Sequence, residues 1–331
     1  MSFSRYNTED SVISAETVVR GMWPGDTNTL STFVTASTTT EYYLDVYDGD
    51  PTLTGSTVQF DIQYGHINGS GSYPINTSIA ALGGYTPSRV VYGQYRNLVY
   101  GTETTNFSFD GGTTTAQQIY IINVNRARYK QALHPGSFNL TLGSGSKTIY
   151  LTDDSNTTSL TRFIGENRIF YIISGSDGNA YTSSAATGPY YGMMLPDLGI
   201  IILDASGSLT PYIQAATLTT ASAQNNHKKL YSSVISGSVS KPFYLQSEEV
   251  VSSRYFFTRV KNSEYNYTTN PSIIDNNGNL LYTTLINNPQ TYITTVGMYN
   301  DNNELLAVAK LSKPLVKDFT KEALIRIKLD Y

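Results

Sequence analysis

The sequence contains no cysteine among its 331 residues. Disulfides, thiolate catalysis and zinc sites with cysteine ligands are therefore excluded, and stability has to come from burial, hydrogen bonds or a partner subunit. No segment approaches the roughly 20 consecutive apolar residues that a membrane-spanning helix needs, so we expect no membrane insertion. Residues 1–7 lack the apolar core of a signal peptide, and we expect no such peptide.

Charge is also scarce, because only 15% of the residues are acidic or basic. The 22 basic and 26 acidic side chains give a net charge of −4, and no run of basic residues occurs. The electrostatic footprint of a nucleic-acid-binding protein is missing, so we expect no nucleic-acid partner. No repeat period is visible either, which disfavours solenoids, propellers and fibres.

Small polar and aromatic residues take the place of charged ones. The chain has 27 tyrosines and 26 glycines, and it is rich in threonine, serine and asparagine. Threonine and tyrosine suit pleated, half-buried surfaces, whereas glycine, asparagine and serine form turns. The composition predicts a mainly β protein, with antiparallel β-sandwich domains, a few short helices and long polar loops.

The clearest strand pattern lies near residue 331. Ile325, Ile327 and Leu329 alternate with charged residues, which is the period-two pattern of a half-buried strand. Further strands are expected at 254–260, 292–299 and 305–311. We therefore assign 241–331 to a C-terminal β-meander that completes a sandwich.

The rest of the chain divides into an N-terminal arm, 1–25, and a β-rich region, 26–240. A short helix over 11–19 is one interpretation of the arm. An arm of this kind packs either on a neighbouring subunit or on its own domain, and its sequence leaves both alternatives open.

The strongest helix signal spans 87–100. Thr86 suits the N-cap, Pro87 suits the first turn and Gly101 suits the end. The predicted apolar stripe is Val91, Tyr95, Leu98 and Val99. Elsewhere we expect strands at 42–47, 57–64, 118–124, 168–173, 192–195 and 199–203, a hairpin at 137–151, helical turns at 126–133 and 230–235, and polar loops at 65–85, 174–190 and 215–229.

No motif specifies catalysis or cofactor binding. Residues 143–148 resemble a phosphate-binding loop, but Ser146 stands where glycine is required and a strand follows, so we predict a hairpin turn. The histidines lack partners at metal-ligand spacing and are expected to be solvated loop residues; they are His66, His134 and His227.

The acidic clusters also have non-catalytic interpretations. Asp45, Asp48 and Asp50 lie near a turn, and turn chemistry accounts for them better than Ca²⁺ binding. Glu248 and Glu249 point to opposite faces of a strand, so we expect surface or interface charges. We therefore expect no enzyme, no cofactor and no metal; a glycosidic hydrolase would need two carboxylates that face one cleft.

Tyrosines and C-terminal basic residues are the candidate functional residues. Tyrosine combines apolar area with a polar tip and is enriched at interfaces. The basic residues give the last sheet a local positive bias that suits an acidic neighbour. The candidate interface residues are Trp23, Tyr265, Tyr267, Lys313, Lys317, Arg326 and Lys328.

Three stretches resemble a known family. They are SRYNTEDS at 4–11, YGQYRNLV at 92–99, and 286–315, which contains INNPQTYITTVGMYND and LLAVAKLSKPL. Together they resemble virion structural proteins of contractile-tailed phages, especially T4-like phages of marine cyanobacteria. The length and the final strand also resemble the β-sandwich wedge protein of T4-type baseplates.

The resemblance implies a multi-copy, non-enzymatic subunit that forms a dimer and links neighbouring wedge proteins. We therefore expect a structural subunit of a tailed-phage virion, located in the baseplate and assembled in the host cytoplasm with other tail proteins. The alternatives are another tail or neck structural protein, or a receptor- or glycan-binding tail module, which the tyrosine-rich loops would suit.

Overall fold

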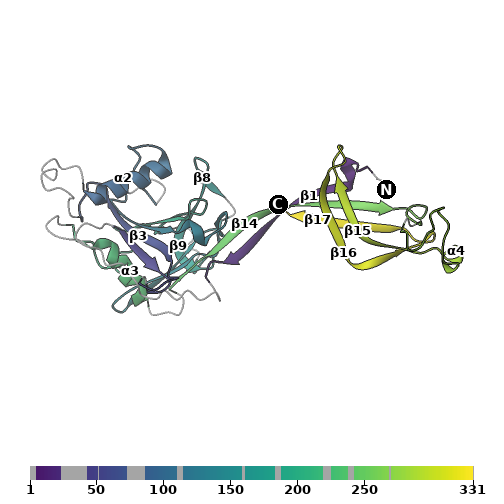
Figure 1. Cartoon of the computed structure of the whole chain (residues 1–331). Helices are drawn as coiled ribbons and strands as arrows, with labels where there is room; N and C mark the ends of the chain where they lie inside the picture. The colour runs from purple at the N-terminus through teal and green to yellow at the C-terminus, as the bar shows by residue number, and fades with distance from the viewer. Residues whose placement is uncertain are drawn as a thin grey trace. The chain divides into compact units, whose positions relative to one another are not determined.

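The computed structural model describes residues 5–23, 43–50, 52–72, 86–109, 115–158, 161–182, 188–218, 225–237, 242–267 and 270–330. The chain divides into two compact units. The central unit is Val18–Glu249, and the terminal unit combines Met1–Thr17 with Val250–Tyr331. Helices α2 and α3 belong to the central unit, whereas strands β15, β16 and β17 belong to the terminal unit (Figure 1).

The central unit is built on one large antiparallel sheet. Its strand order is β13-β6-β7-β9-β11-β12-β4-β3-β2, and β8 and β10 pair with β9. The elements are β2 (Tyr43–Tyr47), β3 (Val58–His66), α2 (Pro87–Tyr100), β4 (Gln118–Val124), β6 (Asn139–Ser144), β7 (Lys147–Asp153), β8 (Arg162–Ile164), β9 (Asn167–Ser176), β10 (Asn179–Ala180), β11 (Gly192–Leu195), β12 (Ile200–Asp204), α3 (Asn226–Ser236) and β13 (Phe243–Tyr244).

Strand β4 separates two hydrophobic cores. Ile119 and Ile121 enter the core that contains α2, whereas Tyr120 and Ile122 enter the core that contains α3. Successive side chains of a strand point to opposite faces, so one strand can serve both cores. Burial on both faces explains why β4 reads as a continuous apolar run.

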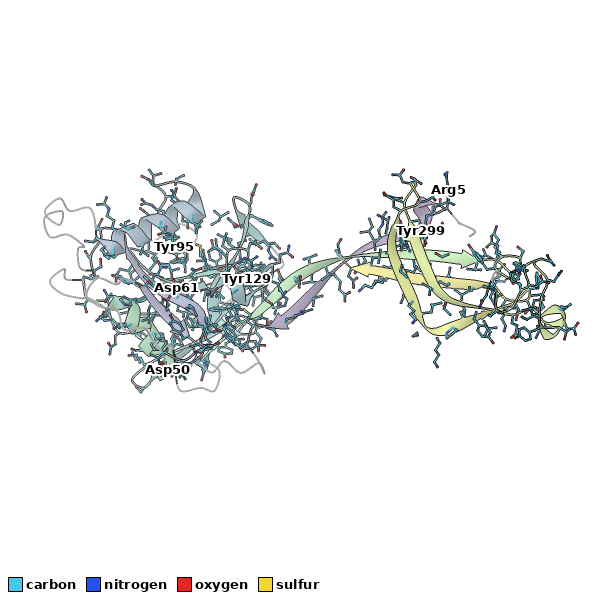
Figure 2. The ribbon with its side chains drawn as sticks, viewed as in Figure 1. Arg5, Asp50, Asp61, Tyr95, Tyr129 and Tyr299 are labelled. Carbon is cyan, nitrogen blue, oxygen red and sulfur yellow. The ribbon has the colours of Figure 1, made fainter. Side chains whose placement is uncertain are left out.

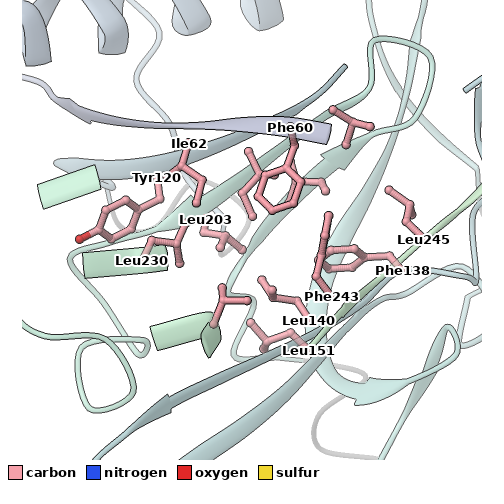
Figure 3. Packing of buried hydrophobic residues seen from close by; sticks show 14 of the residues in the cluster. Phe60, Ile62, Tyr120, Phe138, Leu140, Leu151, Leu203, Leu230, Phe243 and Leu245 are labelled. Atoms are coloured by element: carbon pink, nitrogen blue, oxygen red, sulfur yellow. The ribbon is translucent and has the colours of Figure 1, made fainter. Parts of the chain in front are cut away.

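The α3-side core is centred on Phe243. Its ring centroid lies 4.9 Å from that of Phe60 and 6.2 Å from that of Phe138, both in edge-to-face geometry, and Figure 3 shows the three rings together. This geometry is the favoured one for aromatic pairs. Phe243 belongs to β13 and Phe60 to β3, strands near opposite ends of the sheet order. The sheet is therefore curled around this core, and the predicted mainly β, antiparallel sandwich-like fold is confirmed.

Helix α2 follows its sequence signals. Gly101 adopts a left-handed φ of 68° and its N–H bonds to the carbonyl of Asn97, which closes the helix. The predicted stripe is buried except for Leu98, which is exposed. Tyr92 is buried instead, with its ring 5.3 Å from that of Phe107. Burial of Tyr92 shifts the apolar arc around the helix and leaves Leu98 at its margin.

The terminal unit contains the sheet β1-β14-β17 and the antiparallel hairpin β15–β16. Residues 253–260 of β14 pair antiparallel with β17. Strands β1 and β14 each continue into the central unit. The elements are the 3-10 helix η1 (Thr8–Asp10), β1 (Ser11–Gly21), β14 (Gln246–Val260), α4 (Thr284–Asn287), β15 (Thr291–Tyr299), β16 (Leu305–Lys317) and β17 (Ala323–Asp330).

The sheet and the hairpin pack through a small core. Its buried apolar side chains are Val260, Ile325 and Ile327. Around them lie partly buried side chains from both layers: Phe256, Ile293, Val296, Met298, Ala309, Leu311, Ala323 and Leu329. The alternation predicted for the last strand is therefore confirmed, because Ile325 and Ile327 face inward.

The N-terminal arm is a strand, and the helix considered for 11–19 is wrong. These residues lie in β1, next to β14. The β-branched residues Val12, Ile13 and Val18 favour extended backbone. The arm is also not a separate unit, because its residues up to Thr17 belong to the terminal unit and its residues from Val18 onward belong to the central unit.

Other expected boundaries differ from the structure. The predicted meander, 241–331, begins in the central unit, where Phe243 and Leu245 enter the core. The helical turns at 126–133 are the 3-10 helix η3 (Arg126–Arg128) followed by β5 (Ala132–Leu133), which pairs with β14. Helix α3 begins inside the loop predicted at 215–229, and β9 and β10 enter the loop predicted at 174–190. Most of the loop predicted at 65–85 lies outside the described residues.

Replacing Ile327 with Asp should unfold the terminal unit, because it places an unpaired carboxylate in a core with only three buried apolar side chains among the described residues. We expect a loss of about 3 kcal/mol or more. Hydrogen exchange of peptides from β14, β15 and β17 measures it. Leu324→Asp on the same strand is the control, since Leu324 is exposed; full protection in Ile327→Asp would contradict the assigned core.

Candidate interaction surface

Two of the predicted interface residues are buried within the chain. Trp23 is 6% exposed, donates its indole N–H to Oε1 of Gln59 at 2.8 Å and packs edge-to-face on Phe243. Lys317 is fully buried, and its Nζ donates to three oxygens at 2.9 Å. These oxygens are the carbonyls of Asn262 and Asp318 and Oδ1 of Asn266. Neither side chain is accessible to a partner, and both are accounted for by internal contacts.

Arg326 and Lys328 lie on the outward face of β17, opposite to Ile325 and Ile327. Both flank the ring of Tyr255, at 5.5 Å from the guanidinium carbon and 5.9 Å from Nζ. Nζ of Lys328 also lies 3.1 Å from Oδ1 of Asp330, and this hydrogen bond is the main cause that raises the pKa of Lys328. Exposed pairs of this kind contribute little to stability, so they leave the positive charges available to a neighbour.

The remaining candidates are exposed. Tyr265 has a left-handed φ of 55°, and its carbonyl accepts a hydrogen bond from Oγ1 of Thr291 at 2.6 Å. The hydroxyl of Tyr267 donates to the carbonyl of Gly278 at 3.3 Å. Lys313 lies where β16 departs from regular pairing with β15. All three side chains remain on the surface of the terminal unit.

Exposed apolar side chains are concentrated in the terminal unit. This unit holds about a third of the described residues but more than half of the exposed large hydrophobic side chains among them. Soluble monomers rarely leave extensive apolar area in contact with water unless the area binds something. The terminal unit is therefore the candidate interaction surface, and composition alone gave no sign of this asymmetry.

One part of this surface is a defined cluster at the tip of the β15–β16 hairpin, which we call the hairpin strip. It consists of Tyr299, Leu305, Leu306 and Val308, all exposed. A Cβ at Gly297 would lie 2.9 Å from Cε2 of Tyr299 and 3.5 Å from Cδ1 of Leu305, so these two side chains cover the glycine. Val308 lies directly opposite Gly297 in the register, and Figure 2 labels Tyr299 on this hairpin.

Glu248 is not the surface or interface charge that its sequence context suggests. It is buried, and its two carboxylate oxygens lie 2.7 Å from Nη2 of Arg168 and 3.0 Å from Nδ1 of His134. Nη2 of Arg168 also lies 2.7 Å from Oδ1 of Asp197. Burial by itself would raise the pKa of Glu248, but the hydrogen bonds from His134 and Arg168 outweigh it and lower the pKa. The network joins segments far apart in sequence, which is why adjacent residues could not reveal it.

The expectation that the histidines are solvated loop residues is wrong for His66 and His227. Nδ1 of His66, at the buried end of β3, accepts backbone N–H bonds from Asn68 and Ser70, and burial lowers its pKa. His227 is buried in α3, where burial and then the charge of Lys228 lower its pKa to about 4. Within the described ranges, no group of three or more acidic or histidine side chains is placed to hold a metal.

The predicted turns are confirmed. Residues 143–148 form the end of the β6–β7 hairpin, with Ser144 opposite Lys147 and Gly145 at a φ of 62°. Asp48 accepts hydrogen bonds from the backbone N–H and the hydroxyl of Thr57. Turn chemistry therefore accounts for both motifs.

Replacing Lys317 with Met should destabilise the terminal unit by about 2 kcal/mol or more, because the three oxygens around its buried ammonium lose their donor. The matched control is Lys313→Met on the same strand, which is exposed and should change stability by less than about 0.5 kcal/mol. Denaturant unfolding followed by hydrogen exchange in β16 measures both. Equal effects would contradict the structural role of Lys317.

Acid should weaken the central unit through Glu248 and Asp197, because the folded state lowers both pKa values. The stabilisation is complete above the usual pKa of 4.5 for Glu and is lost as the pH falls through the lowered values. Glu248→Gln should flatten this pH dependence, whereas Glu249→Gln should not. Denaturant unfolding read from the fluorescence of Trp23 between neutral pH and about pH 3 tests it; identical slopes for both variants would refute the assignment.

None of the described helices is long and apolar enough to cross a membrane. Comparisons with protein-family models, with curated proteins and with solved structures each gave no match.

Proposed function

We propose that the chain is a structural subunit of a multi-protein particle and that the terminal unit is its docking module. The observation that supports the proposal is the imbalance inside this unit: its described part has three buried apolar side chains in its core, whereas many other apolar side chains are exposed to water. A neighbour that covered this surface would add about 25 cal/mol per Å² of apolar area buried. A unit with a small core gains the most stability from burial against such a partner.

We further propose that the particle is the virion of a contractile-tailed phage and that the chain belongs to the baseplate wedge as a homo-oligomer. The resemblance of stretches 4–11, 92–99 and 286–315 supports this proposal. The third stretch covers β15 and most of β16. The same residues therefore carry the resemblance and the exposed hairpin strip. Non-enzymatic linkage of tail subunits is the role that this surface suits.

Quantitative mass spectrometry of gradient-purified phage particles tests the proposal. The chain should be present at a fixed stoichiometry to the tail proteins, in contrast to trace host proteins. Particles grown with Ile327→Asp should lack the chain, because its docking module is unfolded, while particles grown with Val90→Asp, an exposed position in α2 of the central unit, should retain it. Wild-type particles without the chain would refute the proposed function.

A further inference from the structure

We infer that the outer face of the β15–β16 hairpin is a homotypic docking surface, which a second copy of this chain occupies in antiparallel orientation across a two-fold axis. The inference rests on the proposed function as an assembly subunit and names one of its contacts. The residues that carry it are the hairpin strip and the charged residues on either side of it.

The hairpin has one face that its own unit cannot cover. Val296 and Met298 of β15 and Ala309 and Leu311 of β16 pack toward the core of the terminal unit. Since neighbouring side chains of a strand alternate between faces, Gly297 and Val308 between them point outward, as their exposure also shows. The strip therefore lies on the side of the hairpin away from the core.

The strip is apolar where it is most exposed. Leu306 is 67% exposed although it is as apolar as any core residue. Gly297 lets Tyr299 and Leu305 lie flat over the strand, because a side chain at this position would collide with the tyrosine ring. The result is a low apolar surface around Gly297, which a similar surface can approach closely.

Charges of opposite sign flank the strip. Asp301 and Glu304 lie in the turn at one end, and Lys310 and Lys313 follow at the other end, so the segment 301–313 is acidic, then apolar, then basic along its length. Glu304 accepts a hydrogen bond from Nδ2 of Asn300 at 2.6 Å, which holds its carboxylate at the turn. Asp301, Lys310 and Lys313 form no ion pair within the described part of the chain.

The order acidic, apolar, basic is complementary to the same order running in the opposite direction. When two copies face each other antiparallel, the acidic turn of each lies against the basic residues of the other, and the apolar strips meet in the middle. A parallel arrangement would instead bring like charges together, which opposes binding. A two-fold axis repeats each favourable contact, so the chain supplies both halves of one self-complementary surface.

The contact is small. Four apolar side chains provide less than the ~800 Å² that each partner buries in a stable complex. We therefore expect weak association of the isolated chain, strengthened in a particle where other contacts hold the copies together. The test has to detect a weak contact of defined orientation. Disulfide cross-linking is suited to this, because the sequence has no cysteine of its own and an introduced cysteine is the only one present.

The full-length Leu306→Cys variant is oxidised and examined for disulfide-linked dimer on a non-reducing gel. Leu306 lies near the middle of the strip, so the two-fold axis brings its two copies together. Leu324→Cys is the matched control, because Leu324 is 68% exposed on β17 of the same unit, away from the hairpin face. We expect at least a fivefold higher dimer yield from Leu306→Cys, and equal yields would overturn the inference.

Charge exchange tests the orientation. Lys310→Glu alone and Asp301→Lys alone should each raise the Kd for self-association about fivefold, because each removes attraction at both ends of the contact. A mixture of the two variants should regain part of the affinity, since one acidic turn again faces one pair of lysines. Sedimentation equilibrium at low and high salt measures this, and a mixture no tighter than either variant alone would refute antiparallel pairing.

The two proposals can fail separately. A chain that is present in the particle but shows no excess cross-linking at Leu306 would overturn the homotypic contact and leave the proposed function standing. A chain that cross-links at Leu306 but is missing from wild-type particles would overturn the virion role and leave the contact standing.

Discussion

The central unit depends on the two-sided burial of strand β4. Its alternate side chains enter two cores, one closed by α2 and the other by α3, so neither face of the sheet is left to water in this region. The curl that brings Phe60 near Phe243 follows from the same constraint, because a flat sheet could not enclose the second core. The unit therefore buries most of its apolar side chains within its own fold. The charges of Glu248, Arg168 and Asp197 are likewise paired with one another inside the unit.

The terminal unit meets the opposite condition. It uses the same antiparallel pairing, yet its two layers enclose only a few side chains around Ile325 and Ile327. A two-stranded hairpin is marginal without support, and here the support comes from one face alone. The two units thus differ in role: the central unit is stabilised by its own packing, and the terminal unit exposes apolar and charged groups. A subunit of an assembly needs both properties, which is why the contrast between the units says more about function than any single residue does.

Structure set by neighbouring residues could be predicted from the sequence, whereas contacts between residues far apart in the chain could not. Pro87 and Gly101 define a helix through backbone constraints that act within a few residues, so α2 could be located from sequence. Burial of Lys317 depends on carbonyls more than fifty residues away, including that of Asn262, and nothing near Lys317 marks it as different from Lys313. The candidate interaction surface lies in the C-terminal region that contains most of the residues proposed from sequence, but two of the proposed residues, Trp23 and Lys317, are buried and the apolar strip was not recognised.

Strand β1 has a consequence for the order of folding. Its residues Ser11–Thr17 are synthesised before the central unit, whereas the residues of its partner β14 from Val250 onward are made only after the whole of Val18–Glu249. The central unit can complete its own sheet while the chain is still growing, whereas Ser11–Thr17 stays unpaired until β14 is made. Closing this pair spans most of the chain, which places it among the slow, non-local steps of folding. During that interval the segment is open to pairing with other chains, so the terminal unit is the part of the protein whose formation is most sensitive to the rate of synthesis and to crowding by neighbouring copies.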